Sequence, residues 1–181
     1  KALHKLQHLL ISGILALSTM VVQAQDFTED FDSGLPPSTG STDLPLKSGD
    51  WGRTGVQSDE TGTKTRDASA DAAYILSGSG NFLVTPKLFN ASDFAFWYRV
   101  DSPGADGFVF DVLASSDGGT TYDIVIADNQ TSLSTSYVEF THTFESIYTG
   151  PIKIATQIEG DSHGLIDDFS ANFTTSFSEN F

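Results

Sequence analysis

Apolar and polar side chains alternate along this chain with a period of two residues, the period of a β-strand rather than of a helix. Residues 94–100 read Phe-Ala-Phe-Trp-Tyr-Arg-Val and residues 108–113 read Phe-Val-Phe-Asp-Val-Leu, and both are rich in aromatic and β-branched side chains. Clusters of Gly, Pro, Ser and Asp separate such segments, as turns do. After residue 24 the sequence has no ten-residue segment with helical periodicity and caps.

This pattern predicts about nine short antiparallel strands, separated by turns every 8–12 residues or so. The expected strands are residues 26–31, 72–76, 81–84, 94–100, 108–113, 122–127, 137–144, 152–158 and 165–173. We therefore predict an all-β fold, an antiparallel jelly-roll β-sandwich over residues 25–174. The side chains expected in its core are Phe94, Phe96, Phe108, Phe110, Val112, Ile124, Ile126, Phe140, Ile152, Ile154 and Leu165.

Residues 33–71 have a different composition, rich in Ser, Thr, Gly, Asp and Pro, with Trp51 as the only aromatic side chain. We interpret them as a long ordered loop that wraps one edge of the sandwich and is fastened by Trp51. A linker between two domains is the alternative, but residues 26–31 alone are too short to fold.

Residues 1–24 are typical of a secretory signal peptide. Lys1 and Lys5 give a positive start, residues 9–22 are largely apolar, and Val22-Gln23-Ala24 is a small-x-small cleavage site. The apolar stretch is shorter than the ~20 residues that cross a bilayer, which disfavours a membrane-spanning helix. We expect a mature protein that starts at Gln25 and is secreted, extracellular or on the cell surface, without membrane insertion.

Acidic residues outnumber basic ones by 24 to 9, so the formal net charge is −15. Nucleic-acid binding needs clustered Lys and Arg to neutralise phosphates, and this composition excludes it. The chain has no cysteine, which excludes disulfides, thiolate metal sites and cysteine nucleophiles. A hydrophobic content of 39% still supports a packed core.

Sequence motifs of common enzymes are absent, among them G-x-S-x-G, H-E-x-x-H, the P-loop and G-x-G-x-x-G. After the leader only His142 and His163 remain as histidines. Glu139 and Glu145 do not form the close pair of carboxylates that retaining glycosidases use. We expect no catalytic activity.

Residues 115–122, Ser-Ser-Asp-Gly-Gly-Thr-Thr-Tyr, match the Asp-box pattern S-x-D-x-G-x-T-W with Tyr in place of Trp. In such a hairpin the Asp carboxylate accepts hydrogen bonds from the turn, and the glycines take positive φ. We interpret this segment as a folding device.

Two acidic clusters lie in the first and last expected strands, at residues 29–32 and 167–168. Terminal strands of a sandwich commonly pair, which would bring these carboxylates together. Ca²⁺ takes 6–8 oxygen ligands and would relieve the repulsion. The sequence predicts one structural Ca²⁺ ion, and the alternative is a solvated acidic edge that limits aggregation. The predicted ligands are Glu29, Asp30, Asp32, Asp167 and Asp168.

Sugar recognition generally needs an exposed aromatic ring beside polar groups, and the candidates here are Trp51, Trp97 and Arg99. Trp97 lies in the most apolar strand, where burial in the core is the favoured alternative. Trp51 has small or polar neighbours, so it is expected to be the more open of the two, although it could serve only to fasten the loop.

Several of these segments resemble, in the same order, the choice-of-anchor J and cleaved-adhesin domains, which are similar to MAM-type jelly rolls. They are Leu-Val-Thr-Pro-Lys-Leu at 83–88, Phe-Trp-Tyr-Arg at 96–99, Ser-Ser-Asp-Gly-Gly at 115–119 and Ile-Asp-Asp at 166–168, together with Glu29 and Phe31 in the first strand. The resemblance covers roughly residues 26–173. It implies a β-sandwich with structural calcium near its chain ends, in secreted multidomain proteins of Gram-negative bacteria that include gingipain-type adhesin regions.

Two functions remain open at this stage. The first is a secreted, non-catalytic accessory module that is adhesive or carbohydrate-binding, whose partner is an extracellular glycan or a cell surface. The second is a ligand-free structural or spacer domain appended to a secreted hydrolase. In both, further domains of the same chain are expected.

The first strand has a counterpart near the end of the chain. Residues 27–31 read Phe-Thr-Glu-Asp-Phe, and residues 177–181 read Phe-Ser-Glu-Asn-Phe. We interpret residues 175–181 as the start of a possible second copy of the module.

Overall fold

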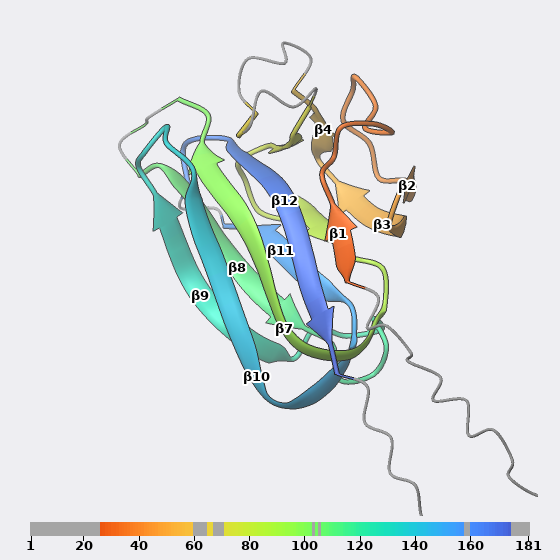
Figure 1. The fold of residues 1–181 in the computed structure, drawn as a ribbon. Helices are drawn as coiled ribbons and strands as arrows, with labels where there is room; N and C mark the ends of the chain where they lie inside the picture. Colours follow the sequence, from red (N-terminus) through yellow and green to blue (C-terminus); the bar gives the residue numbers. More distant parts are fainter. Residues whose placement is uncertain are drawn as a thin grey trace, which may run out of the picture.

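The computed structural model describes residues 26–59, 65–66, 71–102, 104, 106–157 and 160–174. They form twelve strands in two six-stranded sheets, all paired antiparallel (Figure 1). The strands are β1 (Phe27–Glu29), β2 (Leu44–Leu46), β3 (Gly49–Thr54), β4 (Val56–Ser58), β5 (Ala73–Ile75), β6 (Phe82–Val84), β7 (Leu88–Val100), β8 (Phe108–Ala114), β9 (Ile124–Ser132), β10 (Val138–Gly150), β11 (Ile152–Thr156) and β12 (Gly164–Phe173). The predicted all-β sandwich is confirmed.

The first sheet has the strand order β10-β7-β12-β5-β4, and β1 is added to it by pairing with β12. The second sheet has the order β2-β3-β6-β11-β8-β9. In the pair of β1 with β12, Thr28 lies opposite Ser170 and Glu29 lies opposite Phe169. The expected pairing of the first and last strands is therefore confirmed, and it brings the two acidic clusters to the same edge.

The core lies between the two sheets and is built largely from aromatic rings. In β7, the side chains of Phe94, Phe96 and Tyr98 point inward and are buried. The Phe96 and Phe169 rings, from β7 and β12, stack with their centroids 6.3 Å apart. Because β7 places every second side chain in the core over residues 94–100, the alternation seen in the sequence becomes one buried face.

Three of the predicted core residues are less buried than expected. Ile126 and Phe140 are only partly buried and pack against the core from its margin. Ile124 was wrongly placed in the core, since 41% of its surface is exposed. All three lie in β9 or β10, which are edge strands with a neighbour on one side only, so the opposite sheet does not cover them completely.

The prediction of one long loop over residues 33–71 is wrong, because this segment contributes β2 and β3 to one sheet and β4 to the other. These strands are only three to six residues long, and Gly, Pro and Thr occupy several of their outward positions. Arg53 of β3 occupies an inward position, where its guanidinium donates to the carbonyl groups of Ser38, Thr42 and Val56. A polar side chain at an inward position breaks the alternation of apolar and polar residues, so the sequence pattern does not predict this strand.

The turn between β8 and β9 has the geometry expected of the Asp-box pattern. The Asp117 carboxylate accepts hydrogen bonds from the Thr121 backbone N–H at 2.8 Å and from its hydroxyl at 2.9 Å. The first of these bonds is the main reason that the pKa of Asp117 falls to about 2. Gly118 and Gly119 have φ values of 79° and 105°, which suit glycine.

Two predictions fall outside the described residues. The signal peptide at residues 1–24 and the second copy of the first strand at 175–181 both lie there, and they stay predictions. Among the residues that the structure does describe, we find no helix with the length and apolar character required to span a bilayer.

Candidate functional site

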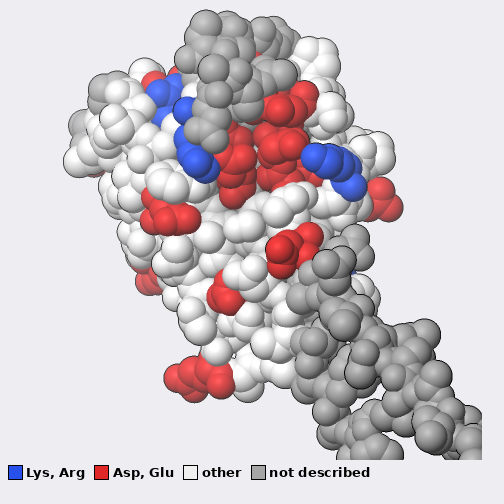
Figure 2. Space-filling model, viewed as in Figure 1, with Lys and Arg blue, Asp and Glu red and all other residues white. Residues whose placement is uncertain are grey.

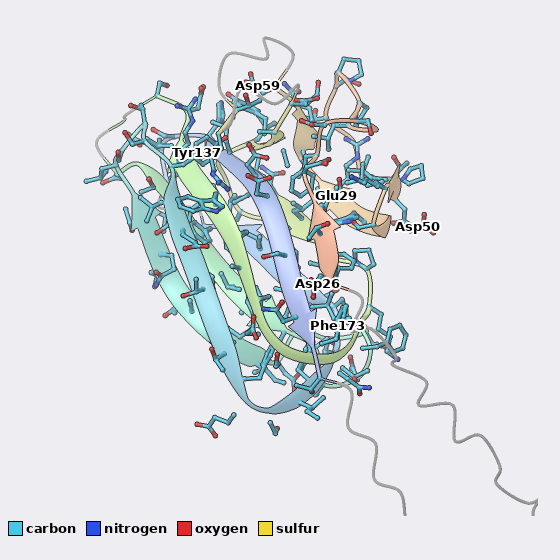
Figure 3. All side chains as sticks on the ribbon, in the orientation of Figure 1. Asp26, Glu29, Asp50, Asp59, Tyr137 and Phe173 are labelled. Atoms are coloured by element: carbon cyan, nitrogen blue, oxygen red, sulfur yellow. The ribbon has the colours of Figure 1, made fainter. Side chains whose placement is uncertain are left out.

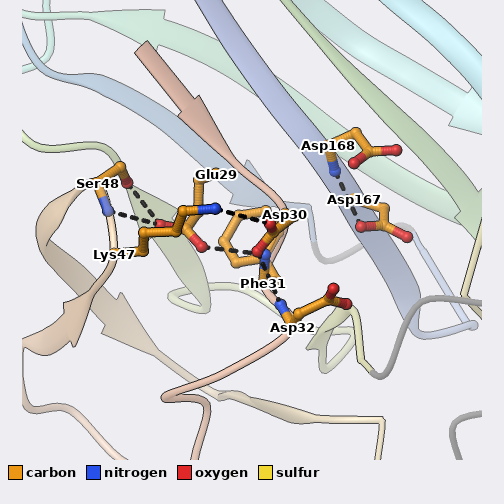
Figure 4. A network of polar contacts seen from close by, with 8 residues as sticks. All are labelled: Glu29, Asp30, Phe31, Asp32, Lys47, Ser48, Asp167 and Asp168. Carbon is orange, nitrogen blue, oxygen red and sulfur yellow. Dashed lines mark hydrogen bonds and ion pairs between the residues drawn. The ribbon is translucent and has the colours of Figure 1, made fainter.

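Strand β1 presents a buried carboxylate, that of Glu29, to the loop between β2 and β3 (Figure 4). Glu29 Oε1 accepts a hydrogen bond from the Phe31 N–H at 3.0 Å. Oε2 accepts from the Ser48 N–H at 3.0 Å and from the Ser48 hydroxyl at 2.6 Å. Three donors thus compensate for the burial of this charge, and Glu29 ties the first strand to the second sheet.

The neighbouring acids of this segment are more exposed. Asp30 Oδ2 lies 3.2 Å from Lys47 Nζ. Asp30 Oδ1 accepts from the Asp32 N–H at 3.3 Å, which turns the chain away from the sheet (Figure 4). Phe31, between them, has a φ of 56° and is buried, so the chain bends sharply while its ring stays in the core.

On the adjacent strand β12, Asp167 is buried and Asp168 is partly exposed. Asp167 Oδ1 accepts from the Asp168 N–H at 2.9 Å, and Oδ2 accepts from the Arg66 N–H at 3.0 Å. Burial raises the pKa of Asp167 to about 7, and the charges of Asp168 and Asp32 add to the rise. The Arg66 guanidinium forms an ion pair with Asp168 at 2.6 Å.

Two further acids, Asp59 and Asp71, belong to this region and were not singled out from the sequence. Asp71 Oδ1 accepts from the Asp59 N–H at 2.7 Å and from the Ala72 N–H at 2.9 Å. Burial raises the pKa of Asp71, and the charges of Asp59 and Asp32 raise it further. Figure 2 shows acidic side chains gathered in one patch on this face, with basic side chains on either side.

The five predicted calcium ligands are brought to one edge of the sandwich, but as placed they do not form a metal shell. Among the residues described here, no three Asp, Glu or His side chains are arranged to hold a metal ion. The carboxylates of Glu29, Asp30, Asp167 and Asp168 all accept hydrogen bonds or ion pairs from protein groups. A calcium ion would have to displace Arg66 or Lys47 from them.

Calcium binding therefore stays a prediction, and a melting experiment tests it. An extracellular site with a Kd of about 10⁻⁴–10⁻³ M, in calcium of about 1 mM, adds roughly 0.4–1.4 kcal/mol to the free energy of unfolding. The expected result is a modest rise in melting temperature over a sample in EDTA. Superimposed curves would contradict it and leave Arg66 and Lys47 as the groups that neutralise this edge.

Trp97 lies on the outer face of the first sheet, in the middle of β7. Its neighbours Phe96 and Tyr98 point into the core, whereas the side chains of Ala95, Trp97 and Arg99 are partly exposed. The predicted alternative, that Trp97 is packed in the core, is therefore wrong. In the register of the sheet Trp97 lies opposite Glu139 of β10 and Asp167 of β12, so carboxylates flank the indole on both sides.

A cavity of about 350 Å³ opens between Trp97 and the first strand. The Arg66 guanidinium lies over the indole, 4.2 Å from its centroid. The cavity is lined by Thr28, Glu29, Asp30, Arg66, Trp97, Asp168, Phe169 and Ser170. Arg66 was missed from the sequence, because nothing in the pattern of its segment shows that it meets a strand about a hundred residues later.

Arg99 lies two residues further along the same face and is engaged by its neighbours. Its Nη1 donates to the Thr135 carbonyl at 2.6 Å, and its guanidinium carbon lies 5.3 Å from the centroid of the Tyr137 ring. Burial raises the pKa of the Tyr137 hydroxyl. Tyr137 comes just before β10, and Asp59 comes just after β4. Both lie toward the same end of the first sheet (Figure 3). Arg99 does not line the Trp97 cavity.

Trp51, predicted to be the more open of the two tryptophans, is completely buried. Its indole packs edge-on against Phe31 and Phe169, with centroids 5.1 and 5.4 Å away, and also contacts Phe27. Its Nε1 donates to Ser48 Oγ at 2.8 Å. The prediction that it stacks on a sugar is wrong, since no face of the ring reaches solvent. Of the small and polar neighbours that suggested exposure, Asp50 and Gly52 lie on the outward side of β3, whereas Ser48 binds the indole N–H.

No protein-family model matches the sequence, and no curated protein is significantly similar to it. Solved structures match the fold. The K2 cleaved adhesin domain of Lys-gingipain matches with a TM-score of 0.58 and 16% identity, over 81% of this chain and 99% of that domain. The K1 cleaved adhesin domain from Porphyromonas gingivalis W83 matches with a TM-score of 0.57 and 16% identity, over 83% and 99%.

A third match is the CBM22-1 xylan-binding domain of Xyn10C from Paenibacillus barcinonensis. Its TM-score is 0.54 at 15% identity, over 85% of this chain and 97% of that domain. The chain thus has the β-sandwich fold of cleaved adhesin domains and of carbohydrate-binding modules, and the predicted resemblance to cleaved adhesins is confirmed in fold. At these identities the similarity concerns the fold alone.

Proposed function

We propose that this chain is a secreted, non-catalytic jelly-roll module that binds a glycan in the cavity beside Trp97, within a longer protein of a cell surface or the extracellular space. The observation that carries the proposal is the position of the Trp97 indole. It is partly exposed in the middle of an outer sheet face and forms one wall of a cavity lined by carboxylates and hydroxyls. An aromatic face beside hydrogen-bonding groups is the arrangement that binds a sugar ring.

The fold matches support this proposal. They include adhesin domains, a xylan-binding domain, and the CBM22-1 and GH10 modules of a Clostridium thermocellum xylanase complexed with xylohexaose. Those proteins are adhesive or carbohydrate-binding modules of larger proteins, and the last is attached to an enzyme. The signal peptide predicted at residues 1–24 supports secretion.

A non-catalytic role is supported by the contacts of the acids in and beside the Trp97 cavity. Asp167 and Asp168 accept hydrogen bonds from Arg66, and Glu29 accepts three from Phe31 and Ser48. General acid–base catalysis needs a carboxyl group that exchanges a proton with substrate. These carboxylates are used instead to hold strands and loops together.

A ligand-free structural or spacer domain is the second candidate, and one observation favours it. The Arg66 guanidinium covers the Trp97 ring and is paired with Asp168, which is also how a purely structural tryptophan would be packed. On this view the cavity has no ligand, and the module only separates other domains of its chain.

A glycan array, followed by titration calorimetry with the best hit, separates the two candidates. Binding by the wild-type chain that is lost in Trp97→Ala is expected if the cavity is the site. The matched control is Tyr122→Ala, which removes a partly exposed aromatic ring outside the lining of the cavity. A blank array with folded protein, or binding that survives Trp97→Ala, would favour the structural candidate or another site.

A further inference from the structure

We propose that the glycan bound beside Trp97 is an amino sugar, whose ammonium group takes the place that the Arg66 guanidinium occupies in this structure. The proposal rests on the proposed function and names the class of ligand for the same cavity. Two features of the cavity support it, namely the charges that line it and the cation that already lies in it.

The charged groups at the cavity are mainly acidic. Glu29, Asp30 and Asp168 line it. Among the lining residues that the structure describes, Arg66 is the one basic residue. The whole chain carries a formal charge of −15. Sulfated sugars and uronic acids would be repelled from such a surface, whereas a cationic ligand would be attracted to it.

The contacts of the Arg66 guanidinium show which groups of this cavity bind a cation. Its guanidinium is 4.2 Å from the centroid of the Trp97 ring and 2.6 Å from Asp168 Oδ2, so it contacts the π face and a carboxylate together. An ammonium group can make the same two interactions, because a cation over an indole is attracted by the ring quadrupole and a carboxylate adds a charge-assisted hydrogen bond. The sugar ring that carries the ammonium group would lie against the remaining indole surface.

A neutral sugar would displace Arg66 at a net loss. Asp168 and the ring would both lose their cation, and a hydroxyl group replaces neither interaction fully. An amino sugar returns a cation to both groups. Selectivity is therefore expected to follow the charge on the sugar, with Arg66 as an internal competitor that lowers the affinity of every ligand.

The test compares two oligosaccharides with the same sugar backbone, the tetramer of glucosamine and the tetramer of N-acetylglucosamine, which carry a charged ammonium group and a neutral acetamide group on C2. Titration calorimetry is done with the full chain at mildly acidic pH, where sugar amines are protonated. We expect the glucosamine tetramer to bind about tenfold more tightly or better, which corresponds to roughly 1.4 kcal/mol, within the range of one desolvated cation–π contact. The preference should shrink as the salt concentration rises.

Three variants test whether the preference for the glucosamine tetramer arises in this cavity. Asp168→Asn should abolish most of the preference for the glucosamine tetramer, and Trp97→Ala should abolish binding of both tetramers. Arg66→Gln removes the internal competitor and should increase affinity for the glucosamine tetramer. Glu145→Gln, which removes one exposed charge from β10 outside the lining of the cavity, is the matched control and should leave binding unchanged.

Equal affinity for the two tetramers would overturn the amino-sugar proposal while leaving glycan binding intact. If binding of the glucosamine tetramer is insensitive to Asp168→Asn and Trp97→Ala, the proposal is also overturned, because such binding would reflect only nonspecific attraction of a cation to an acidic protein. If neither tetramer binds, the proposal fails, and the glycan array then decides whether the cavity binds a different sugar or none.

Discussion

Replacing Trp51 by alanine is expected to lower the free energy of unfolding by about 3–5 kcal/mol, the cost of removing a large aromatic side chain from a core. The indole is completely buried and contacts Phe27, Phe31 and Phe169, so its loss opens a void that three rings from two strands and a loop would line. The Ser48 hydroxyl would also lose the N–H that it accepts. Urea denaturation, followed by far-UV circular dichroism, measures the effect.

The matched control for this experiment is Trp97→Ala, the same substitution at a partly exposed position. Its expected cost is about 1 kcal/mol, because solvent already reaches part of the ring. The two variants should therefore separate stability from binding, with Trp51→Ala lowering stability and Trp97→Ala lowering ligand affinity. A Trp51 variant as stable as the wild type would contradict the packing described here.

Replacing Glu29 by alanine is expected to cost about 2–4 kcal/mol. The change removes the acceptor of the Phe31 N–H, the Ser48 N–H and the Ser48 hydroxyl, and a buried donor left without an acceptor costs about 1–3 kcal/mol. Because Glu29 joins β1 to the loop between β2 and β3, the loss should loosen the first strand in particular. Hydrogen exchange at the Thr28 and Phe31 amides reports that loosening.

Asp30→Ala is the control for Glu29→Ala, since it removes a carboxylate one residue away. Its ion pair with Lys47 joins two side chains that are 39% and 68% exposed, and such pairs contribute about 0–1 kcal/mol. A similar loss in both variants would mean that net charge at this edge, and not the hydrogen bonds of Glu29, accounts for the effect.

The acidic edge and the Trp97 cavity depend on one feature, the pairing of β1 with β12. That pairing places Glu29 opposite Phe169. On its other side β12 pairs with β7, and a register shift in that pairing leaves Asp168 in a bulge, where its φ of 46° turns the side chain away from the regular alternation. The bulge lets Asp168 reach Arg66 while Phe169 stays in the core. The same irregularity thus serves packing and the candidate site.

Much of the fold follows from the sequence by itself. The alternation in residues 94–100 and 108–113 determined that these segments are strands and which side chains of each share a face, because successive side chains of a strand point to opposite sides. The Asp-box turn at 115–122 followed from local chemistry alone. Both depend on residues close together in the chain, which the sequence shows directly.

Which face of each strand is covered was decided only by the tertiary structure. Alternation places Trp97 and Phe96 on opposite faces of their strand, but the packing of the second sheet decides that Phe96 is buried and that Trp97 is partly exposed. Trp51 is buried because β1 and β12 close over it, and Arg66 reaches Asp168 from 102 residues earlier in the chain. Burial and long-range contacts arise when distant segments pack together, and no local pattern records that packing.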